Sequence, residues 1–134
     1  MIFYINTKGF NDVVDITEKV SELAAQSGVE DGICLVSCSG STAGVTTIEY
    51  EEGAIKDLKR ALEILAPMNG IYEHQKKWGD GNGYAHVRSA LMKPCISFPM
   101  EKGRIKLGTW QQIVLIDFDN RPRERELSVK VVSS

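Results

Sequence analysis

The sequence predicts a single α+β domain over residues 1–134, with one large, mostly antiparallel or mixed sheet and helices packed on it. Short β-prone segments outnumber the segments whose apolar residues recur at helical spacing. Most of these β-prone segments can pair as antiparallel neighbours. No repeat, low-complexity tract or long linker divides the chain, and 134 residues suit one domain.

Three helices are expected. Asp15 and Glu18 resemble a capping box, with Asp15 as the N-cap of the first helix. Apolar residues on one stripe predict a second helix over residues 54–66. Asn82 can cap a short third helix, which Pro94 stops.

Strands are expected over residues 2–5, 33–37, 45–48, 95–100, 104–107, 110–118 and 127–132. Residues 33–37 are almost entirely apolar, which is typical of a strand buried on both faces, and residues 45–48 are expected to pair beside it. Gly103 marks a hairpin. Residues 110–118 have apolar side chains at both odd and even positions, so both faces of this strand should be covered, as in the middle of a sheet.

Composition narrows the classes of function. The 16 basic and 18 acidic side chains give a net charge of −2, so a nucleic-acid partner held by phosphate contacts is not expected. No apolar run approaches the roughly 20 residues that cross a bilayer, so no membrane partner is expected. The first residues lack the features of a signal peptide, which favours a cytoplasmic location.

The three cysteines, Cys34, Cys38 and Cys95, are an odd number without a C-x-x-C pair. Cys34 and Cys38 are four apart on an expected strand, so both should face the same side. A redox or metal role is one interpretation, but packing as small apolar residues is the favoured one for all three.

Both histidines, His74 and His86, fall in or beside a glycine-rich irregular segment, residues 69–83. A single histidine is more often structural or solvated than functional, but their shared location favours a function. Asn82 and His86 are four apart and would share one face of a helix. Glycines before that helix let a ligand approach the backbone, and its N-terminal N–H groups suit an anion such as phosphate.

The same segment fits no established ligand-binding motif. Gly81 and Gly83 lack the third glycine of G-x-G-x-x-G, and no G-K-[ST] triplet follows. An EF-hand loop would need a glutamate where Leu91 stands. The histidine spacing matches no helical or zinc-finger pattern, and no Ser or Cys lies in a nucleophile elbow.

Two further polar segments allow more than one interpretation. Residues 39–44 form either a simple turn or a cluster of hydroxyl and N–H groups for an anion. Arg121, Arg123 and Arg125 share the parity of Leu127, so an unbroken strand would direct them to the buried face. A solvated arginine ladder is the default; the alternatives are a bulge, or pairing with carboxylates or with a phosphate at a subunit contact.

Several motifs together resemble the YjbQ-like family, UPF0047, also called secondary thiamine-phosphate synthase enzymes. They are G-D-G-N-G-Y-A-H-V-R at 79–88, G-R at 103–104, L-G-T-W-Q-Q-I at 107–113, S-T-A-G at 41–44 and the helix at 57–67. The resemblance spans residues 15–132. It implies an α+β fold, a homotrimer, and a polar pocket lined by histidines near the subunit contacts.

The resemblance also implies a transferase acting on a phosphorylated small molecule. Some members join a pyrimidine diphosphate to a thiazole phosphate with loss of pyrophosphate, usually with the help of a divalent metal ion, Mg or Zn. Two family histidines are absent here, since Gly40 and Tyr84 occupy their positions. The alternative is therefore a non-catalytic trimeric module that binds an anion or a metal ion.

Site residues follow from the motifs and from the polar clustering. His74 and His86 are expected to act as acid–base groups or metal ligands, with Asn82 orienting them and Glu49 as the carboxylate partner. Contacts to substrate or phosphate are expected from Ser41, Thr42, Gly81, Gly83, Arg88 and Gln111.

Overall fold

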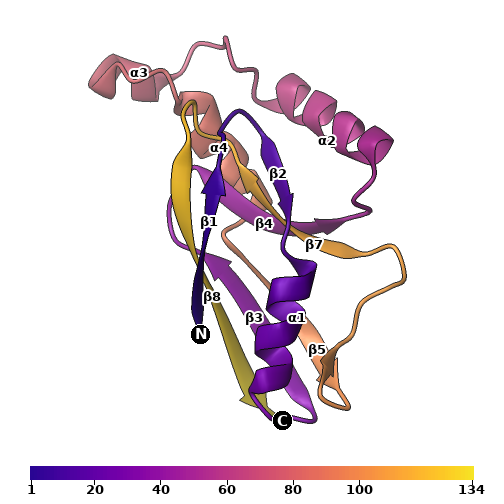
Figure 1. The fold of residues 1–134 in the computed structure, drawn as a ribbon. Coiled ribbons are helices and arrows are strands. Elements are labelled where there is room, and N and C mark those ends of the chain that lie inside the picture. The colour runs from indigo at the N-terminus through magenta and orange to yellow at the C-terminus, as the bar shows by residue number, and fades with distance from the viewer.

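The computed structural model of the protein describes all of residues 1–134 as eight strands and four helices (Figure 1). In chain order these are β1 (Ile2–Thr7), β2 (Asp12–Asp15), α1 (Thr17–Gln26), β3 (Gly32–Cys38), β4 (Ala43–Ile48), α2 (Glu52–Leu65), α3 (Glu73–Trp78), α4 (Gly83–Met92), β5 (Cys95–Glu101), β6 (Arg104–Ile105), β7 (Gln112–Asp117) and β8 (Arg123–Ser133).

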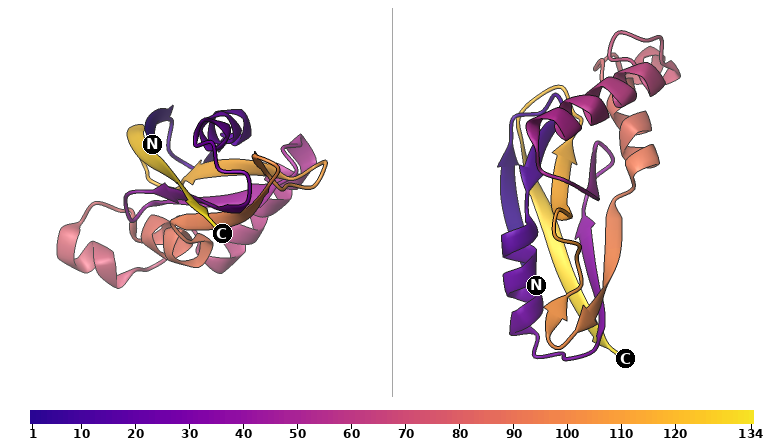
Figure 2. Two further views of the ribbon diagram at one scale, coloured as in Figure 1. Left: turned by 90° about the horizontal axis from the view of Figure 1, so that it is seen from below. Right: turned by 90° about the vertical axis from the view of Figure 1, so that its right-hand side faces the viewer.

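The strands pair entirely antiparallel, in a five-stranded sheet of order β1-β8-β3-β5-β6 and a three-stranded sheet of order β2-β7-β4. The α+β class with helices packed on antiparallel strands is confirmed, although hydrogen bonding divides the expected single sheet into two. The expected pairing of residues 45–48 beside residues 33–37 is wrong, because β4 pairs with β7. Figure 2 shows α1 on one side of the strands, with α2 and α4 on the other.

Two buried clusters hold these layers together. Val20 and Leu23 of α1 pack in the larger cluster with residues of both sheets, and Leu62 of α2 packs in the smaller one with Tyr84 of α4. β7 contributes to both clusters because Ile113 and Leu115 point to one side, while Val114 and Ile116 point to the other. The expectation that this strand lies in the middle of a sheet is confirmed.

The outer face of the five-stranded sheet has no partner within the chain. Cys34 and Val36 face the core, whereas Ile33 is 57 % exposed and Leu35 is 37 % exposed. The prediction that residues 33–37 are buried on both faces is therefore wrong for the single chain. Ile33 lies between Pro99 and Val132 of the neighbouring strands, so an apolar row crosses three strands on this face.

The three expected helices are present; α1 and α2 start at other residues than predicted, whereas α4 starts directly after Asn82 as predicted. Ile16 occupies the N-cap position of α1, but the Asp15 carboxylate accepts bonds from the Thr17 N–H and Oγ1 at 3.0 and 2.6 Å. α2 begins two residues early because the Glu51 side chain accepts from the N–H groups of Gly53 and Ala54. None of the four helices combines the length and apolar character that crossing a membrane requires.

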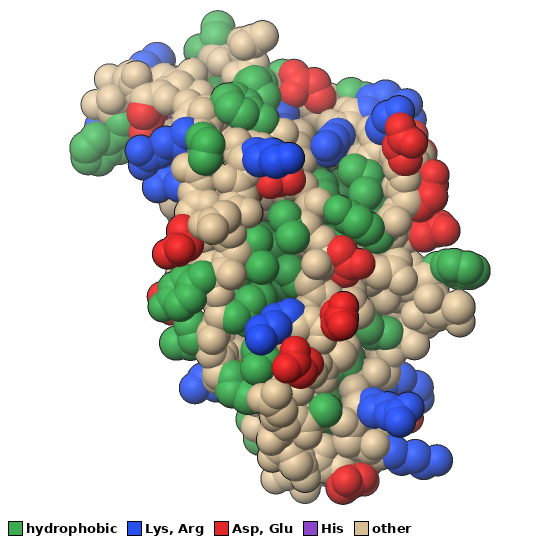
Figure 3. All heavy atoms as spheres, in the orientation of Figure 1, with side chains coloured by type: hydrophobic (Ala, Val, Ile, Leu, Met, Phe, Trp, Pro, Cys, Tyr) green, Lys and Arg blue, Asp and Glu red, His purple; other side chains and the backbone are tan.

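The elements without a sequence prediction are β2 and the six-residue helix α3. The hairpin at Gly103 is confirmed, since β5 and β6 pair across Lys102 and Gly103, both of which have positive φ. Cys34 and Cys38 are buried on one face as expected, whereas Cys95 is exposed. Side chains of both charges are interspersed on the face in Figure 3.

Candidate functional site

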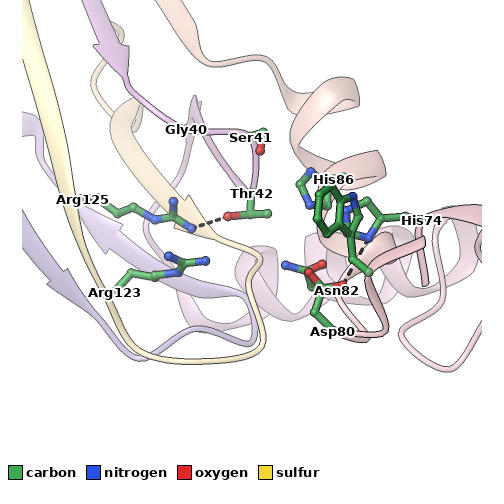
Figure 4. Close-up of a pocket in the computed structure, with 10 residues that line it drawn as sticks. Gly40, Ser41, Thr42, His74, Asp80, Asn82, His86, Arg123 and Arg125 are labelled. Atoms are coloured by element: carbon green, nitrogen blue, oxygen red, sulfur yellow. Dashed lines mark hydrogen bonds and ion pairs between the residues drawn. The ribbon is translucent and has the colours of Figure 1, made fainter. Parts of the chain in front are cut away.

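A polar cavity of about 350 Å³ lies where the β3–β4 turn, the start of β8, and helices α3 and α4 converge. Figure 4 shows guanidinium groups on one side of it and imidazole rings on the other. The cavity is lined by Gly40, Ser41, Thr42, His74, Trp78, Asp80, Asn82, His86, Arg123 and Arg125.

The two histidines meet in this cavity from different helices. The ring centroids of His74 on α3 and His86 on α4 are 4.3 Å apart, with the planes tilted by 38°. Burial and the neighbouring His74 lower the pKa of His86 below its ordinary 6.5, against the opposing effect of Asp119 and Asp80. The His86 imidazole is therefore neutral at pH 7 and can accept a proton or donate its single N–H.

Arg123 and Arg125 reach the cavity from the start of β8. Arg125 is almost completely buried and binds both oxygens of Asp117, with its Nε 2.7 Å from Oδ2 and its Nη2 2.8 Å from Oδ1. Arg123 donates to Asp119 from Nε and Nη2. The default expectation of a solvated arginine ladder is wrong for these two residues, and the carboxylate-pairing alternative is confirmed. Of the three arginines, only Arg121 is exposed.

Asp119 organises the wall behind the arginines. Its carboxylate accepts bonds from Thr42 Oγ1, from Asn82 Nδ2, from the Asn120 N–H and from Arg123. Burial alone would raise the pKa of Asp119, but these hydrogen bonds outweigh it and lower the pKa to about 2. The carboxylate stays ionised and fully covered, so it fixes the arginines without facing the cavity.

The guanidinium groups keep donors free for a ligand. The Nη1 atoms of Arg123 and Arg125 make no hydrogen bond within the chain. Gly40 has a φ of 124°, and a Cβ there would stand 3.0 Å from Arg125 Nη1. A side chain at position 40 would therefore cover this donor, and glycine leaves it open to the cavity.

The structure brings together five of the residues predicted for the site: Ser41, Thr42, His74, Asn82 and His86. Asn82 and His86 share one helix face, as their spacing predicts. Asn82 occupies the N-cap position of α4, but its side chain accepts no backbone N–H of the helix, and its Nδ2 donates to Asp119 at 3.2 Å. Its Oδ1 is buried and has no partner in the chain.

Glu49 and Gln111 lie outside this cavity. Glu49 lines a separate hollow beside Trp110. The Gln111 side chain accepts from the Gly108 N–H and donates to Thr47 Oγ1. Within one chain, the expected pairing of Glu49 with the histidines is absent.

The assignment of Arg88 to a phosphate contact needs correction. Its side chain is completely buried, and it donates to Ala66 O at 2.9 Å, Asn11 Oδ1 at 2.9 Å and Glu63 Oε2 at 2.6 Å. Because the side chain is 0 % exposed, its remaining N–H groups cannot reach a ligand in the cavity. Arg88 instead ties α4 to the end of α2 and to the β1–β2 turn.

The two glycines predicted to bind phosphate, Gly81 and Gly83, have structural roles instead. Gly81 adopts a φ of 71° in the turn before α4 and lies outside the cavity. Gly83 is buried, and a Cβ there would stand 2.5 Å from the Cβ of Tyr72. Glycine at position 83 is therefore needed for close packing against Tyr72, not for contact with an anion in this cavity.

The side chains of the single chain do not fit a divalent metal ion. No group of three or more His, Cys, Asp or Glu residues is arranged to hold one. His74 Nδ1 lies 3.3 Å from Asp80 Oδ1, but His86 stacks on the His74 ring and no third ligand joins them. The metal ion implied by the resemblance stays a prediction.

Sequence reasoning missed Trp78, Asp117 and Asp119, and left Arg123 and Arg125 unassigned. One signal was available, since Asp117 and Asp119 come directly after the apolar run at residues 113–116, where an unpaired carboxylate would be costly. Arg123 and Arg125, at alternate positions of the following strand, were the available partners for these carboxylates.

Comparison with known proteins identifies the family. Residues 1–134 match the model of the family described as UPF0047 protein YjbQ-like. The chain belongs to this family. The resemblance inferred from the 79–88 and 107–113 motifs is thereby confirmed.

Relatives in the family share about a third of the residues. A UPF0047 protein of Archaeoglobus fulgidus is 34 % identical over 90 % of this chain and 91 % of its own length. The UPF0047 protein YugU of Bacillus subtilis is 32 % identical over 96 % of this chain and 95 % of its own length.

Solved structures of the family share the fold. The fold matches a YbjQ-like protein of unknown function from Sulfolobus solfataricus with a TM-score of 0.90 at 27 % identity, covering 100 % of this chain and 97 % of that one. It matches a YjbQ/UPF0047 protein from Clostridium acetobutylicum with a TM-score of 0.89 at 34 % identity, covering 98 % and 99 %.

Proposed function

We propose that the cavity binds the phosphate or diphosphate group of a small molecule and that the protein is a transferase of the thiamine-phosphate synthase type. One observation carries the proposal: two arginines with free Nη1 donors face two stacked histidines across one cavity of about 350 Å³. Guanidinium groups bind phosphate oxygens through charge-assisted hydrogen bonds. The hydroxyl group of Ser41, which is exposed at the rim, adds a further donor.

The reaction needs stabilisation of a leaving diphosphate more than it needs a strong base. The thiazole nitrogen forms a bond to the methylene carbon of the pyrimidine, the C–O bond breaks, and its electron pair leaves with the diphosphate. Arg123 and Arg125 would stabilise the charge that develops on the leaving oxygen. The bound diphosphate would raise the proton affinity of His86, which could then protonate the leaving group.

The test is thiamine phosphate formation by the purified protein from the two phosphorylated substrates, combined with calorimetric binding of inorganic pyrophosphate. We expect Arg123→Gln to weaken pyrophosphate binding by about tenfold or more, because a charge-assisted contact is lost. Arg121→Gln is the matched control, since Arg121 is exposed and lies outside the cavity. Its affinity should stay within about twofold of wild type.

Three outcomes separate the interpretations. Turnover that His86→Ala abolishes supports the transferase, and equal turnover by wild type and His86→Ala would remove His86 from the mechanism. Pyrophosphate binding without turnover favours the alternative, a non-catalytic anion-binding module. That alternative is motivated by Gly40 and Tyr84, which replace two family histidines. Equal losses of pyrophosphate affinity in Arg123→Gln and Arg121→Gln would contradict the proposal that pyrophosphate binds in this cavity.

We also propose that the protein assembles as a homotrimer. The support from this chain is the outer face of the five-stranded sheet, where Ile2, Tyr4, Ile33 and Val132 are each more than half exposed. An apolar row across neighbouring strands is costly to leave in water and suits the surface of a second copy.

A further inference from the structure

Helix α3 forms one wall of the arginine–histidine cavity, the cavity lined by Arg123, Arg125, His74 and His86. It contributes His74 and also Trp78, which is 65 % exposed. Figures 1 and 2 show α3 at one end of the molecule, projecting beyond the strands. The position of α3 therefore decides how far this cavity is open to water.

Little holds α3 to the rest of the protein. None of its six residues is buried, and its main neighbour is α4. All hydrogen bonds made by residues 73–79 have their partners within residues 72–79. A segment with few buried contacts and no hydrogen bond to its surroundings separates locally at a low cost in free energy.

The contact between α3 and α4 also leaves polar atoms unsatisfied. Four buried side-chain atoms have no hydrogen-bond partner within the chain, and all four belong to α3 or to the start of α4: His74 Nδ1, Gln75 Oε1, Asn82 Oδ1 and Tyr84 Oη. Each is costly to bury in this way. Water reaches these atoms when α3 moves away, so hydration offsets the contacts that the movement breaks.

Two fixed points limit the movement of α3. Before the helix, Tyr72 packs on α4, since a Cβ on Gly83 would stand 2.5 Å from the Tyr72 Cβ. After the helix, Asp80 O accepts from Asn120 Nδ2 at 2.8 Å. Gly79 lies between the helix and this second point, with a φ of 68° and nothing within 4 Å of the position of a Cβ. Glycine there can change its backbone conformation freely, as a hinge requires.

We propose that α3 is a lid over the arginine–histidine cavity, which opens to admit a phosphorylated ligand and closes when the ligand is bound. This inference rests on the proposed phosphate site. A ligand favours the closed arrangement only if it gains contacts there. His74 and Trp78 supply those contacts, because both are carried by α3 and line the cavity when α3 packs on α4. Closure also keeps water from the bound phosphate group.

Hydrogen–deuterium exchange of the full chain, with and without inorganic pyrophosphate, tests both movements. In the free protein, the backbone amides of α3 should exchange at least about tenfold faster than those of α4. Saturating pyrophosphate should slow the exchange of α3 by about threefold or more, because only the closed arrangement offers every contact. Helix α2 lines no part of the cavity, so its exchange should stay unchanged.

Gly79→Ala tests the hinge. Alanine is disfavoured at a φ of 68°, so this variant should be open more often and bind pyrophosphate about threefold or more weakly. Gly28→Ala is the matched control, because Gly28 has a φ of 73°, has nothing within 4 Å of a Cβ, and lies beyond α1 outside the cavity. Its affinity should stay within about twofold of wild type. Thermal unfolding checks that both variants are folded.

The outcomes separate the lid from the phosphate site. If pyrophosphate binds to wild type without slowing the exchange of α3, the lid is overturned and the proposed function stands. Amides of α3 that are as slow as those of α4 in the free protein would overturn the lid whatever binds. So would equal pyrophosphate affinities of Gly79→Ala and Gly28→Ala. No binding of pyrophosphate to wild type would contradict the proposed function, and the closing step with it.

Discussion

At the residue scale, Asp119 does more than any other single side chain to shape the phosphate cavity. Its carboxylate binds Thr42, Asn82 and Arg123, which line the cavity from three different elements. The Asp117 carboxylate likewise accepts hydrogen bonds from Arg125 and Thr7. Two buried carboxylates therefore decide where the exposed donors of the site stand.

Asp119→Asn is expected to reduce the loss of unfolding free energy that wild type shows at acid pH. The pKa of Asp119 is lowered from 3.8 to about 2 in the folded protein. Its ionised form therefore stabilises the fold above pH ~4, and this contribution of about 2 kcal/mol is lost as the pH falls from about 4 to about 2. Urea unfolding at pH 6 and pH 2 measures it.

The stability gap between wild type and Asp119→Asn should narrow by about 2 kcal/mol over that range. The control is Asp57→Asn, which removes an exposed carboxylate paired with Arg60 on α2. It should change stability by less than about 0.5 kcal/mol. Parallel pH profiles for wild type and Asp119→Asn would show that the carboxylate is not stabilised in the folded state.

At the element scale, α4 is held by two adjacent buried side chains, Arg88 and Ser89. Ser89 Oγ donates to Ala43 O of β4, and Arg88 connects the helix to α2 and to the β1–β2 turn. His86 is carried by the same helix. The position of α4 therefore determines where His86 stands in the arginine–histidine cavity.

Arg88→Met tests this structural role. The change leaves Ala66 O and Asn11 Oδ1 without their buried donor, while Glu63 is half exposed and can be hydrated. We expect a loss of about 2–4 kcal/mol in the free energy of unfolding, measured by denaturant titration. Arg60→Met removes an arginine that is 71 % exposed and should cost less than about 0.5 kcal/mol. Lost pyrophosphate binding at unchanged stability would restore Arg88 to the ligand site.

The sequence predicted elements best where their patterns are long. Helix α2 and strand β7 have enough apolar residues to define a period, whereas α3 has six residues and β2 has four. Pairing between distant strands is not encoded locally, so β4 was placed beside the wrong neighbour.

The sequence predicted only the part of the candidate site that local spacing determines. Asn82 and His86 are one helical turn apart, so spacing placed them together. Arg123 and Arg125 join them only because β8 runs beside β3 and β1. Arg88 looked like a ligand contact because a charged residue in a motif gives no sign of whether its partner is a substrate or the chain's own carbonyl groups.

At the scale of the whole molecule, the outer sheet face is the surface most in need of a partner. Ile33 lies opposite Pro99 on β5 and Val132 on β8, which makes the row continuous across hydrogen-bonded strands. Charged and polar residues such as Lys130 and Ser97 flank this row on the same face. The arrangement resembles an apolar interface centre with a polar rim.

Ile33→Glu is expected to dissociate the proposed trimer. A carboxylate at the centre of the apolar row would be desolvated without a partner, so sedimentation equilibrium should show the dissociation constant raised by about 10-fold or more. Ile64→Glu is the matched control, because Ile64 is 76 % exposed on α2 and away from this sheet face. A wild-type protein that sediments as a monomer, or equal effects of both variants, would contradict the assembly.

The pairing of each cavity arginine with a buried aspartate has a consequence for how fast a ligand arrives. Two guanidinium and two carboxylate charges cancel, so the empty site projects little field beyond about 8–10 Å, the Debye length at physiological ionic strength. Long-range attraction of a diphosphate is weak, and the association rate should vary little with added salt. Selection between anions then occurs after contact, through the directions of the free N–H groups.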